Sequence, residues 1–136
     1  MIVDSISIPV TPERAPRMTA RDKWTNVEKG KGRPTVLRYF KYRDDLRREL
    51  PGYRLPAQLY LTFFLPMPPS WSKRRRSEML GAPHDQTPDI DNLVKAFMDA
   101  FNKDEHGNKM SDAHVYYITA EKYWAEEGSI ELGDAR

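Results

Sequence analysis

Two aspartates separated by a single residue, Asp89 and Asp91, lie between a proline and a segment with a helical pattern. Residues two apart on a helix do not face each other, so both carboxylates can face one point only if Asp89 lies just before the helix. Pro88 favours this, because proline pushes the preceding residue toward extended geometry and is tolerated at a helix start. The apolar residues that follow have helical spacing; they are Leu93, Val94, Phe97 and Phe101. The stretch therefore predicts a helix with two acids at its mouth and one face on a core.

A lysine and a third aspartate complete the candidate site. Lys95 follows Asp91 by four residues, so the two share a helix face, and Asp112 stands at the start of a predicted strand over 112–124. Three converging carboxylates repel each other unless a cation lies among them, and hard divalent cations prefer oxygen ligands. We predict that Asp89, Asp91 and Asp112 bind Mg²⁺, with Mn²⁺ able to replace it. Lys95 would orient a water molecule or stabilise charge in the transition state.

A purely structural explanation of the same residues stays open. Aspartate is a favoured N-cap, and acids in a first turn complement the helix dipole. On this explanation Asp89 caps the helix, Asp91 lies in its first turn, and Lys95 is the ion-pair partner of Asp91. Asp99, two turns beyond Asp91, is either a reserve acid or a surface residue.

The histidines and cysteines predict no zinc site. The three histidines, His84, His106 and His114, do not have the His-x₃-His spacing of such a site, and the chain has no cysteine. Disulfides and thiolate zinc sites are therefore excluded. His114 would share a strand face with Asp112, and we interpret it as a structural histidine.

The charge distribution predicts a nucleic-acid partner. Although the formal net charge is only +2, residues 13–54 hold 13 lysines and arginines against 6 acids, and residues 120–136 hold 2 against 5. Basic surfaces attract phosphate backbones without reading their sequence. Aromatic residues are interleaved with these charges, namely Trp24, Tyr39 and Trp71. A second basic run is a candidate phosphate contact, or else a solvated helix face; it consists of Lys73, Arg74, Arg75 and Arg76.

We predict a single α+β domain over residues 1–136, with a small mixed β-sheet packed by two main helices. The chain has no run of 18 apolar residues and no signal-peptide pattern at its start, so we expect a cytoplasmic protein. Residues 11–34 are rich in proline, glycine and charge, which is typical of a long basic loop. The other segments are a strand within 2–10, a helix over 35–50, a strand over 59–65, a basic helix or loop over 71–80, the Asp-x-Asp helix, the strand over 112–124, and a last strand over 128–132 pairing back as a hairpin.

Residues Pro88 to Val115 resemble the core motif of the RusA-like family of Holliday junction resolvases, which is common in phages and prophages. The shared features are an Asp-x-Asp-Asn that opens a helix, a lysine four residues after the second aspartate, and a further aspartate before a Gln-Val-like pair. Two features differ from the family pattern. Ser111 stands where the family often has a second acid, and the turn over 104–109 is longer and more charged. The first difference leaves Asp112 as the third ligand candidate.

The resemblance implies a Mg²⁺-dependent endodeoxyribonuclease that cuts two strands of a four-way DNA junction symmetrically. It further implies a homodimer, acting in a bacterial or phage-infected cell. The residues by themselves indicate only a metal-dependent phosphodiesterase. Two alternatives stay open: a nuclease for other branched or replication-linked DNA, and a non-catalytic DNA-binding protein with a vestigial site.

Overall fold

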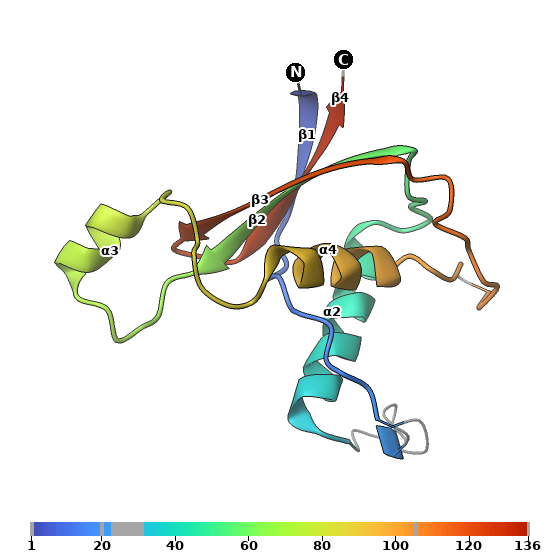
Figure 1. Cartoon of the computed structure of the whole chain (residues 1–136), viewed down its shortest axis with the longest axis horizontal. Helices are drawn as coiled ribbons and strands as arrows, with labels where there is room; N and C mark the ends of the chain where they lie inside the picture. Colours follow the sequence, from blue (N-terminus) through green and yellow to red (C-terminus); the bar gives the residue numbers. More distant parts are fainter. Residues whose placement is uncertain (1, 20, 23–31, 105, 136) are drawn as a thin grey trace.

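The computed structural model describes residues 2–19, 21–22, 32–104 and 106–135 (Figure 1). Within these residues, four strands and three helices form an α+β fold. In chain order they are β1 (Ile2–Ile8), α2 (Pro34–Glu49), β2 (Gln58–Pro66), α3 (Lys73–Met79), α4 (Ile90–Asp99), β3 (Tyr117–Ala125) and β4 (Ser129–Ala135). No helix in the described part of the chain is long and apolar enough to cross a membrane.

The strands form one mixed sheet in the order β1-β4-β2-β3. β4 pairs antiparallel with both β1 and β2, whereas β2 and β3 are parallel. Parallel neighbours need a crossover connection, and α4 lies in the connection between β2 and β3. Figure 1 shows α4 and α2 together below the sheet, while α3 projects away from the body. α4 therefore runs back from the carboxyl ends of β2 and β3 toward their amino ends.

The core lies between the sheet and the two main helices. Alternate residues of β2 are buried, as expected for a strand with one face on a core; they are Leu59, Leu61, Phe63 and Leu65. The apolar stripe of α4 packs against them, with Leu93 and Phe97 fully buried. α2 adds Tyr42 and Leu46 to the same cluster. The predicted helical spacing after Asp91 thus identified the buried face of α4.

Two hydrogen bonds join α2 to the carboxyl-terminal end of α4. The Tyr39 hydroxyl donates to Asp99 Oδ2 at 3.4 Å, and Arg47 Nε donates to the Ala100 carbonyl at 2.6 Å. Burial, together with the nearby Asp99 carboxylate, raises the pKa of Tyr39 to about 12, so the phenol keeps the proton that it donates. Arg47 satisfies a carbonyl that the end of a helix leaves without an intrahelical partner. Asp99 therefore has a structural role.

The predicted α+β class and the mixed sheet with two main helices are confirmed. β1 and α3 fall within their predicted segments, and α2 and β2 agree with theirs to within one residue at each end. The strand predicted over 112–124 begins only at Tyr117. The predicted final hairpin is also wrong, because β4 pairs with β1 and β2 rather than with β3. In that position Ile130 lies opposite Phe63 and both are fully buried, which favours it over a place beside the exposed edge strand. Trp24 and part of the predicted 11–34 loop lie outside the described residues.

Candidate active site

Asp89 and Asp91 lie at the amino-terminal end of α4, as predicted. Asp89 is the N-cap residue with extended backbone, and its carbonyl accepts hydrogen bonds from the N–H groups of Asn92 and Leu93, both at 3.1 Å. Its carboxylate makes no capping hydrogen bond within the described chain. The carboxylate of Asp91 accepts from the N–H of Asn92 at 2.9 Å. Because the Asp89 carboxylate caps no N–H group of the described residues, helix capping does not explain this residue. Both aspartates are exposed, so both carboxylates are open to a ligand.

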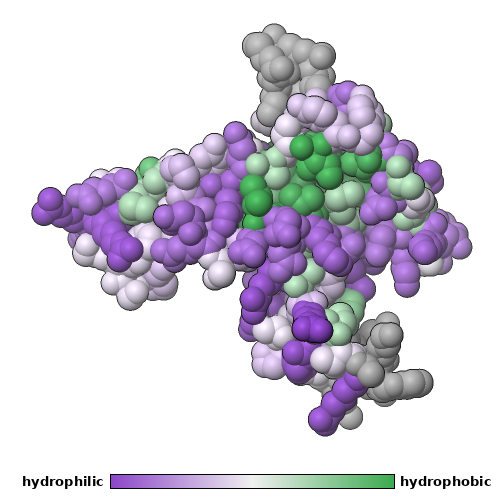
Figure 2. Space-filling view, in the orientation of Figure 1, coloured by the Kyte–Doolittle hydropathy of each residue, from purple (hydrophilic) through white to green (hydrophobic). Residues whose placement is uncertain are grey.

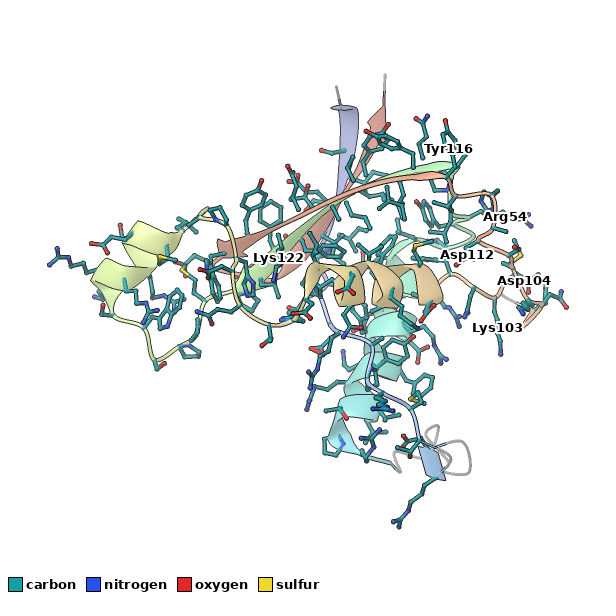
Figure 3. All side chains as sticks on the ribbon, viewed as in Figure 1. Arg54, Lys103, Asp104, Asp112, Tyr116 and Lys122 are labelled. Carbon is teal, nitrogen blue, oxygen red and sulfur yellow. The ribbon has the colours of Figure 1, made fainter. Side chains whose placement is uncertain are left out.

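Lys122 of β3 holds the loop that carries the two aspartates (Figure 3). Its Nζ donates to the carbonyls of Gln86 and Pro88 at 2.6 and 2.8 Å, and its own carbonyl accepts from the His84 N–H at 3.0 Å. The sheet thereby fixes the chain immediately before Asp89. Lys122 was not predicted as a site residue. The sequence signal was a lysine that alternates with Ile118, Ala120 and Trp124 on the core-facing side of β3.

Lys95 lies one turn beyond Asp91 and is exposed, as predicted. Its Nζ donates to Asp99 Oδ2 at 2.9 Å, forming an i,i+4 ion pair away from the helix mouth. The structure therefore lacks the ion pair between Lys95 and Asp91 that the structural explanation predicts, because Lys95 pairs with Asp99 instead. Ion pairs this exposed contribute little to stability, so the lysine can exchange Asp99 for a phosphate at small cost.

Asp112 lies beyond the opposite end of α4 (Figure 3). The N–H of Met110 donates to the Asn102 carbonyl at 2.7 Å, just after the helix, and the N–H of Tyr116 donates to the Ala57 carbonyl at 3.0 Å, just before β2. Asp112 is held between these two anchors, at the amino ends of the parallel strands. It lies in an exposed loop, not at a strand start as predicted.

A single chain does not bring the three predicted metal ligands together. At 1.5 Å per residue, the ten residues of α4 make a helix about 15 Å long. Asp89 and Asp91 lie at its start, whereas Asp112 lies beyond its end (Figure 3). Consistent with this, the described residues contain no group of three or more histidine, aspartate or glutamate side chains placed to hold a metal ion. Of the three predicted ligands, Asp89 and Asp91 are the two that lie at the same end of α4.

A basic pocket adjoins the helix mouth. Its volume is about 530 Å³, and Asn92 and Lys95 line its α4 side. Thr35 lines it from the first turn of α2. The other lining residues come from the basic segment before α2, namely Arg14, Ala15, Pro16, Arg17 and Arg33. Sequence reasoning marked residues 13–54 as basic but did not single out Arg14 or Arg17. Only the fold brings them beside α4.

An ion pair holds the pocket wall in place. Arg33 donates through Nη2 to Asp22 Oδ2 at 2.7 Å and through Nε to Asp22 Oδ1 at 3.2 Å, and Nη2 also donates to the Arg17 carbonyl at 2.8 Å. The hydrogen bonds from Arg33 are the main cause that holds the pKa of Asp22 well below its usual range. Because Arg33 already forms an ion pair with Asp22, Arg14 and Arg17 are the better candidates for contact with an anion.

The basic run divides into two kinds of residue on α3, which buries none of its side chains. Arg76 is structural, because it donates to the Pro68 carbonyl at 2.9 Å and to Glu126 Oε2 at 2.9 Å. Arg75 lies over the Trp71 ring at 4.1 Å from its centroid. Arg74 pairs with Glu78 at 3.1 Å while remaining 89% exposed. Lys73, Arg74 and Arg75 thus present charge to solvent, whereas Arg76 anchors the helix.

The two described histidines near the site have structural environments. His84 is buried against Trp124, with ring centroids 4.1 Å apart, and burial together with the charge of Lys122 lowers its pKa. His114 Nε2 donates to the Leu55 carbonyl at 2.5 Å. This contact agrees with the interpretation of His114 as structural, although it lies in a loop rather than on a strand.

Comparison with known proteins gives one family. The sequence profile of the family described as "Endodeoxyribonuclease RusA" matches residues 9–133. The matched range includes Asp89, Asp91, Lys95 and Asp112, as well as the basic pocket and α3. No curated protein matches the chain in a sequence comparison.

Proposed function

The chain belongs to the RusA family of Holliday junction endodeoxyribonucleases, and we propose that it cuts four-way junctions at the amino-terminal end of α4, in two symmetric places. The supporting observation is the pair of exposed carboxylates of Asp89 and Asp91 next to the basic pocket. The carboxylate of Asp89 makes no capping hydrogen bond within the described part of the chain. Asp112 is proposed as the third acid of the site.

Nucleases of this family depend on a metal ion. We propose Mg²⁺, with Mn²⁺ able to replace it, and Asp89 and Asp91 as ligands. Mg²⁺ usually binds through one or two carboxylates and keeps several waters, which suits two exposed aspartates at a helix mouth. A bound divalent ion supplies charge neutralisation on the phosphate and a more acidic water. Lys122 keeps the aspartates in place by holding the Gln86 and Pro88 carbonyls.

The basic pocket is proposed to hold the DNA backbone next to the cleaved bond. Arg14 and Arg17 reach it from the segment before α2, and Lys95 reaches it from α4. Phosphate contacts of this kind position the backbone and carry no sequence information. Lys95 differs from the two arginines because it is also one helical turn from Asp91. It is therefore placed to act on charge that develops during cleavage.

Replacing Lys95 with alanine is expected to lower kcat by about 10²–10³, the usual effect of losing one electrostatic donor to the transition state. The Kd for a junction should change far less, because several other cations contact the backbone. Single-turnover cleavage and fluorescence anisotropy measure the two quantities. The matched control is Lys41→Ala, which removes another helix lysine with an i,i+4 aspartate partner, Asp45 at 2.7 Å, and should leave kcat unchanged. An equal loss of binding and turnover would make Lys95 a simple backbone contact.

Replacing Lys73, Arg74 and Arg75 together with alanine is expected to weaken binding to junction and duplex DNA alike. Each lost phosphate contact lowers the slope of log Kobs against log[salt] by about 0.9 on duplex DNA, so three contacts lower it by about 2.7. Arg76→Ala is the comparison variant. It should lower the thermal stability, because Glu126 loses its ion-pair partner, and it should change the salt slope little. An unchanged slope in the triple variant would show that α3 is only a solvated surface and that the 13–54 region carries the DNA.

Cleavage of synthetic DNA in defined metal ions tests the proposed function. A four-way junction, a fork, a flap and a linear duplex are each incubated with Mg²⁺, Mn²⁺ or EDTA, and products are mapped on a sequencing gel. We expect paired, symmetric cuts in the junction with Mg²⁺ or Mn²⁺, and no cuts in duplex or in EDTA. Preferential cutting of the fork or flap would support the alternative of a nuclease for other branched DNA. Junction binding without cleavage in either ion would support a vestigial site.

A further inference from the structure

We propose that Trp124 is a positioning residue that fixes α3 relative to the amino-terminal end of α4, so that phosphate contact on α3 decides which bond of the DNA reaches Asp89 and Asp91. The inference rests on the proposed function and concerns how the position of the cut is chosen. Its basis is a continuous set of ring contacts and backbone hydrogen bonds between β3 and the segments on either side of α3.

α3 depends on its flanking segments for its position. The helix buries none of its own side chains, and it projects away from the body of the protein (Figure 1). Figure 2 shows hydrophilic surface over much of this projection. Packing of an apolar face is what usually stabilises a helix in a protein. Because α3 has no such face, the residues before and after it, together with Arg76, have to hold it in place.

Four side chains form a stack that joins α3 to β3. The Arg75 guanidinium lies 4.1 Å from the centroid of the ring of Trp71, which precedes the helix. The Trp71 ring is 4.8 Å from that of Trp124 on β3, and the Trp124 ring is 4.1 Å from that of His84. Neighbouring aromatic rings attract each other beyond the effect of burial alone. Trp124 is at the centre of the stack and is only 3% exposed.

The chain that leaves α3 is bound to the same part of β3. The Gly81 N–H donates to the Trp124 carbonyl at 2.9 Å, and the Trp124 N–H donates to the Ala82 carbonyl at 3.0 Å. Two residues further on, the His84 N–H donates to the Lys122 carbonyl at 3.0 Å. This segment therefore runs along β3, and both the chain that enters α3 and the chain that leaves it contact Trp124.

Lys122 and Trp124 hold opposite ends of the connection between α3 and α4. They are two residues apart, so their side chains lie on the same side of β3. Trp124 holds the end next to α3. Lys122 holds the end next to Asp89, through two backbone carbonyls (Figure 3). One strand thus fixes both the basic helix and the loop that carries Asp89, so the distance between them is set by the protein and not by the DNA.

A fixed distance between two backbone contacts determines where the DNA is cut. Lys73, Arg74 and Arg75 are exposed on α3, and phosphate contacts fix the register of a protein on DNA without reading its sequence. Successive phosphates of one strand of a duplex are about 3.4 Å apart along the helix axis. A shift of α3 by this distance would therefore bring a different bond to Asp89 and Asp91.

Replacing Trp124 with leucine tests the inference. Leucine keeps an apolar side chain but removes the ring that Trp71 and His84 contact. Trp124 lies outside the main buried cluster, so the variant should fold, which a thermal melt checks. In junction cleavage with Mg²⁺, we expect cuts at several neighbouring bonds in place of the wild-type pair. The rate at the wild-type bonds should fall by up to about 10²-fold, the size of effect that a 1 Å misplacement can have.

The position of the cuts is the decisive readout, and a sequencing gel measures it. A residue that only stabilises the fold changes the rate or the melting temperature and leaves the cut positions as they are. A folded Trp124→Leu variant that cuts only at the wild-type bonds, whatever its rate, would overturn the inference.

Two further variants make the test independent of how well Trp124→Leu folds. Trp71→Leu removes the other large ring of the stack from a half-buried position before α3, and it should scatter the cuts in the same way. Unchanged cut positions in Trp71→Leu would overturn the inference. Tyr123→Leu is the matched control, because Tyr123 lies next to Trp124 on the opposite face of β3, 6.2 Å from the Phe64 ring. Scattered cuts in this control would contradict a specific role of Trp124.

A combined variant shows whether Trp124 acts through α3. Residues that act through one shared contact have non-additive effects. The triple alanine variant of Lys73, Arg74 and Arg75 should scatter the cuts by itself, and adding Trp124→Leu should scatter them no further. An additional scatter as large as that of Trp124→Leu alone would mean that the tryptophan acts on the Asp89 loop without α3, which overturns the inference.

Local motion of α3 supplies a readout that needs no activity, because the chain has no native cysteine. Ser77→Cys places a spin label on an exposed position of α3. Its EPR lines should narrow when Trp124→Leu is added and stay unchanged with Tyr123→Leu. Lines that Trp124→Leu leaves unchanged would overturn the inference. A wild-type chain that cuts no branched DNA, with a label that still loses order in Trp124→Leu, would refute the proposed function and leave the role of Trp124 in holding α3 standing.

Discussion

Asp91→Asn is expected to reduce the rate of junction cleavage by at least about 10²–10³ while the protein still folds and binds DNA. The substitution keeps the shape of the side chain and removes its charge. The carboxylate accepts one hydrogen bond, from the Asn92 N–H, which an asparagine oxygen can also accept. Its cost in stability should stay below about 1 kcal/mol, the usual size of an acid's interaction with a helix amino terminus. Junction binding should be unchanged or tighter, because a negative charge facing phosphate is lost.

Single-turnover cleavage in Mg²⁺, anisotropy with a labelled junction and a thermal melt measure these three effects. Asp89→Asn and Asp112→Asn should give the same pattern. Asp85→Asn is the matched control, because it removes an exposed acid only four residues before Asp89 and should leave all three quantities unchanged. Full cleavage by Asp112→Asn would remove Asp112 from the proposed site.

Phe97→Ala is expected to lower the free energy of unfolding by about 3–5 kcal/mol, the usual cost of emptying a fully buried aromatic position. Phe97 is 0% exposed and packs against Phe101 with ring centroids 5.3 Å apart, in the layer between α4 and β2. Because domains are stable by only about 5–15 kcal/mol, this loss would leave little net stability. It would also loosen the helix that carries Asp91 and Lys95, so activity should fall together with stability.

Urea unfolding at a fixed protein concentration measures this effect, since dimerisation would otherwise shift the apparent midpoint. Phe40→Ala is the matched control: Phe40 is only half-buried on α2, with Arg43 over its ring at 4.5 Å. It should cost clearly less than Phe97→Ala. Equal losses from the two variants would contradict the position of the core between α4 and the sheet.

Local patterns determined much of this fold. The spacing of Leu93 and Phe97 marked the buried face of α4 because helical periodicity is a property of neighbouring residues. The alternation along β2 identified its buried face for the same reason. The spacing of Asp89 and Asp91 predicted that Asp89 lies just before the helix, and its N-cap position confirms this. The family resemblance was likewise carried by a short motif, and the match over residues 9–133 confirms the family.

Only the tertiary structure decided which distant segments meet. The pairing of β4 with β2 and the place of Lys122 under the Asp-x-Asp loop depend on contacts between residues far apart in the chain. The same holds for Arg14 and Arg17, which a loop brings beside α4. Asp112 shows the consequence most clearly. Sequence proximity to the motif suggested a shared site, but a parallel β2–α4–β3 crossover necessarily places the start of α4 and the start of β3 at opposite ends of the sheet. Helix length, not the motif, sets the distance between the acids.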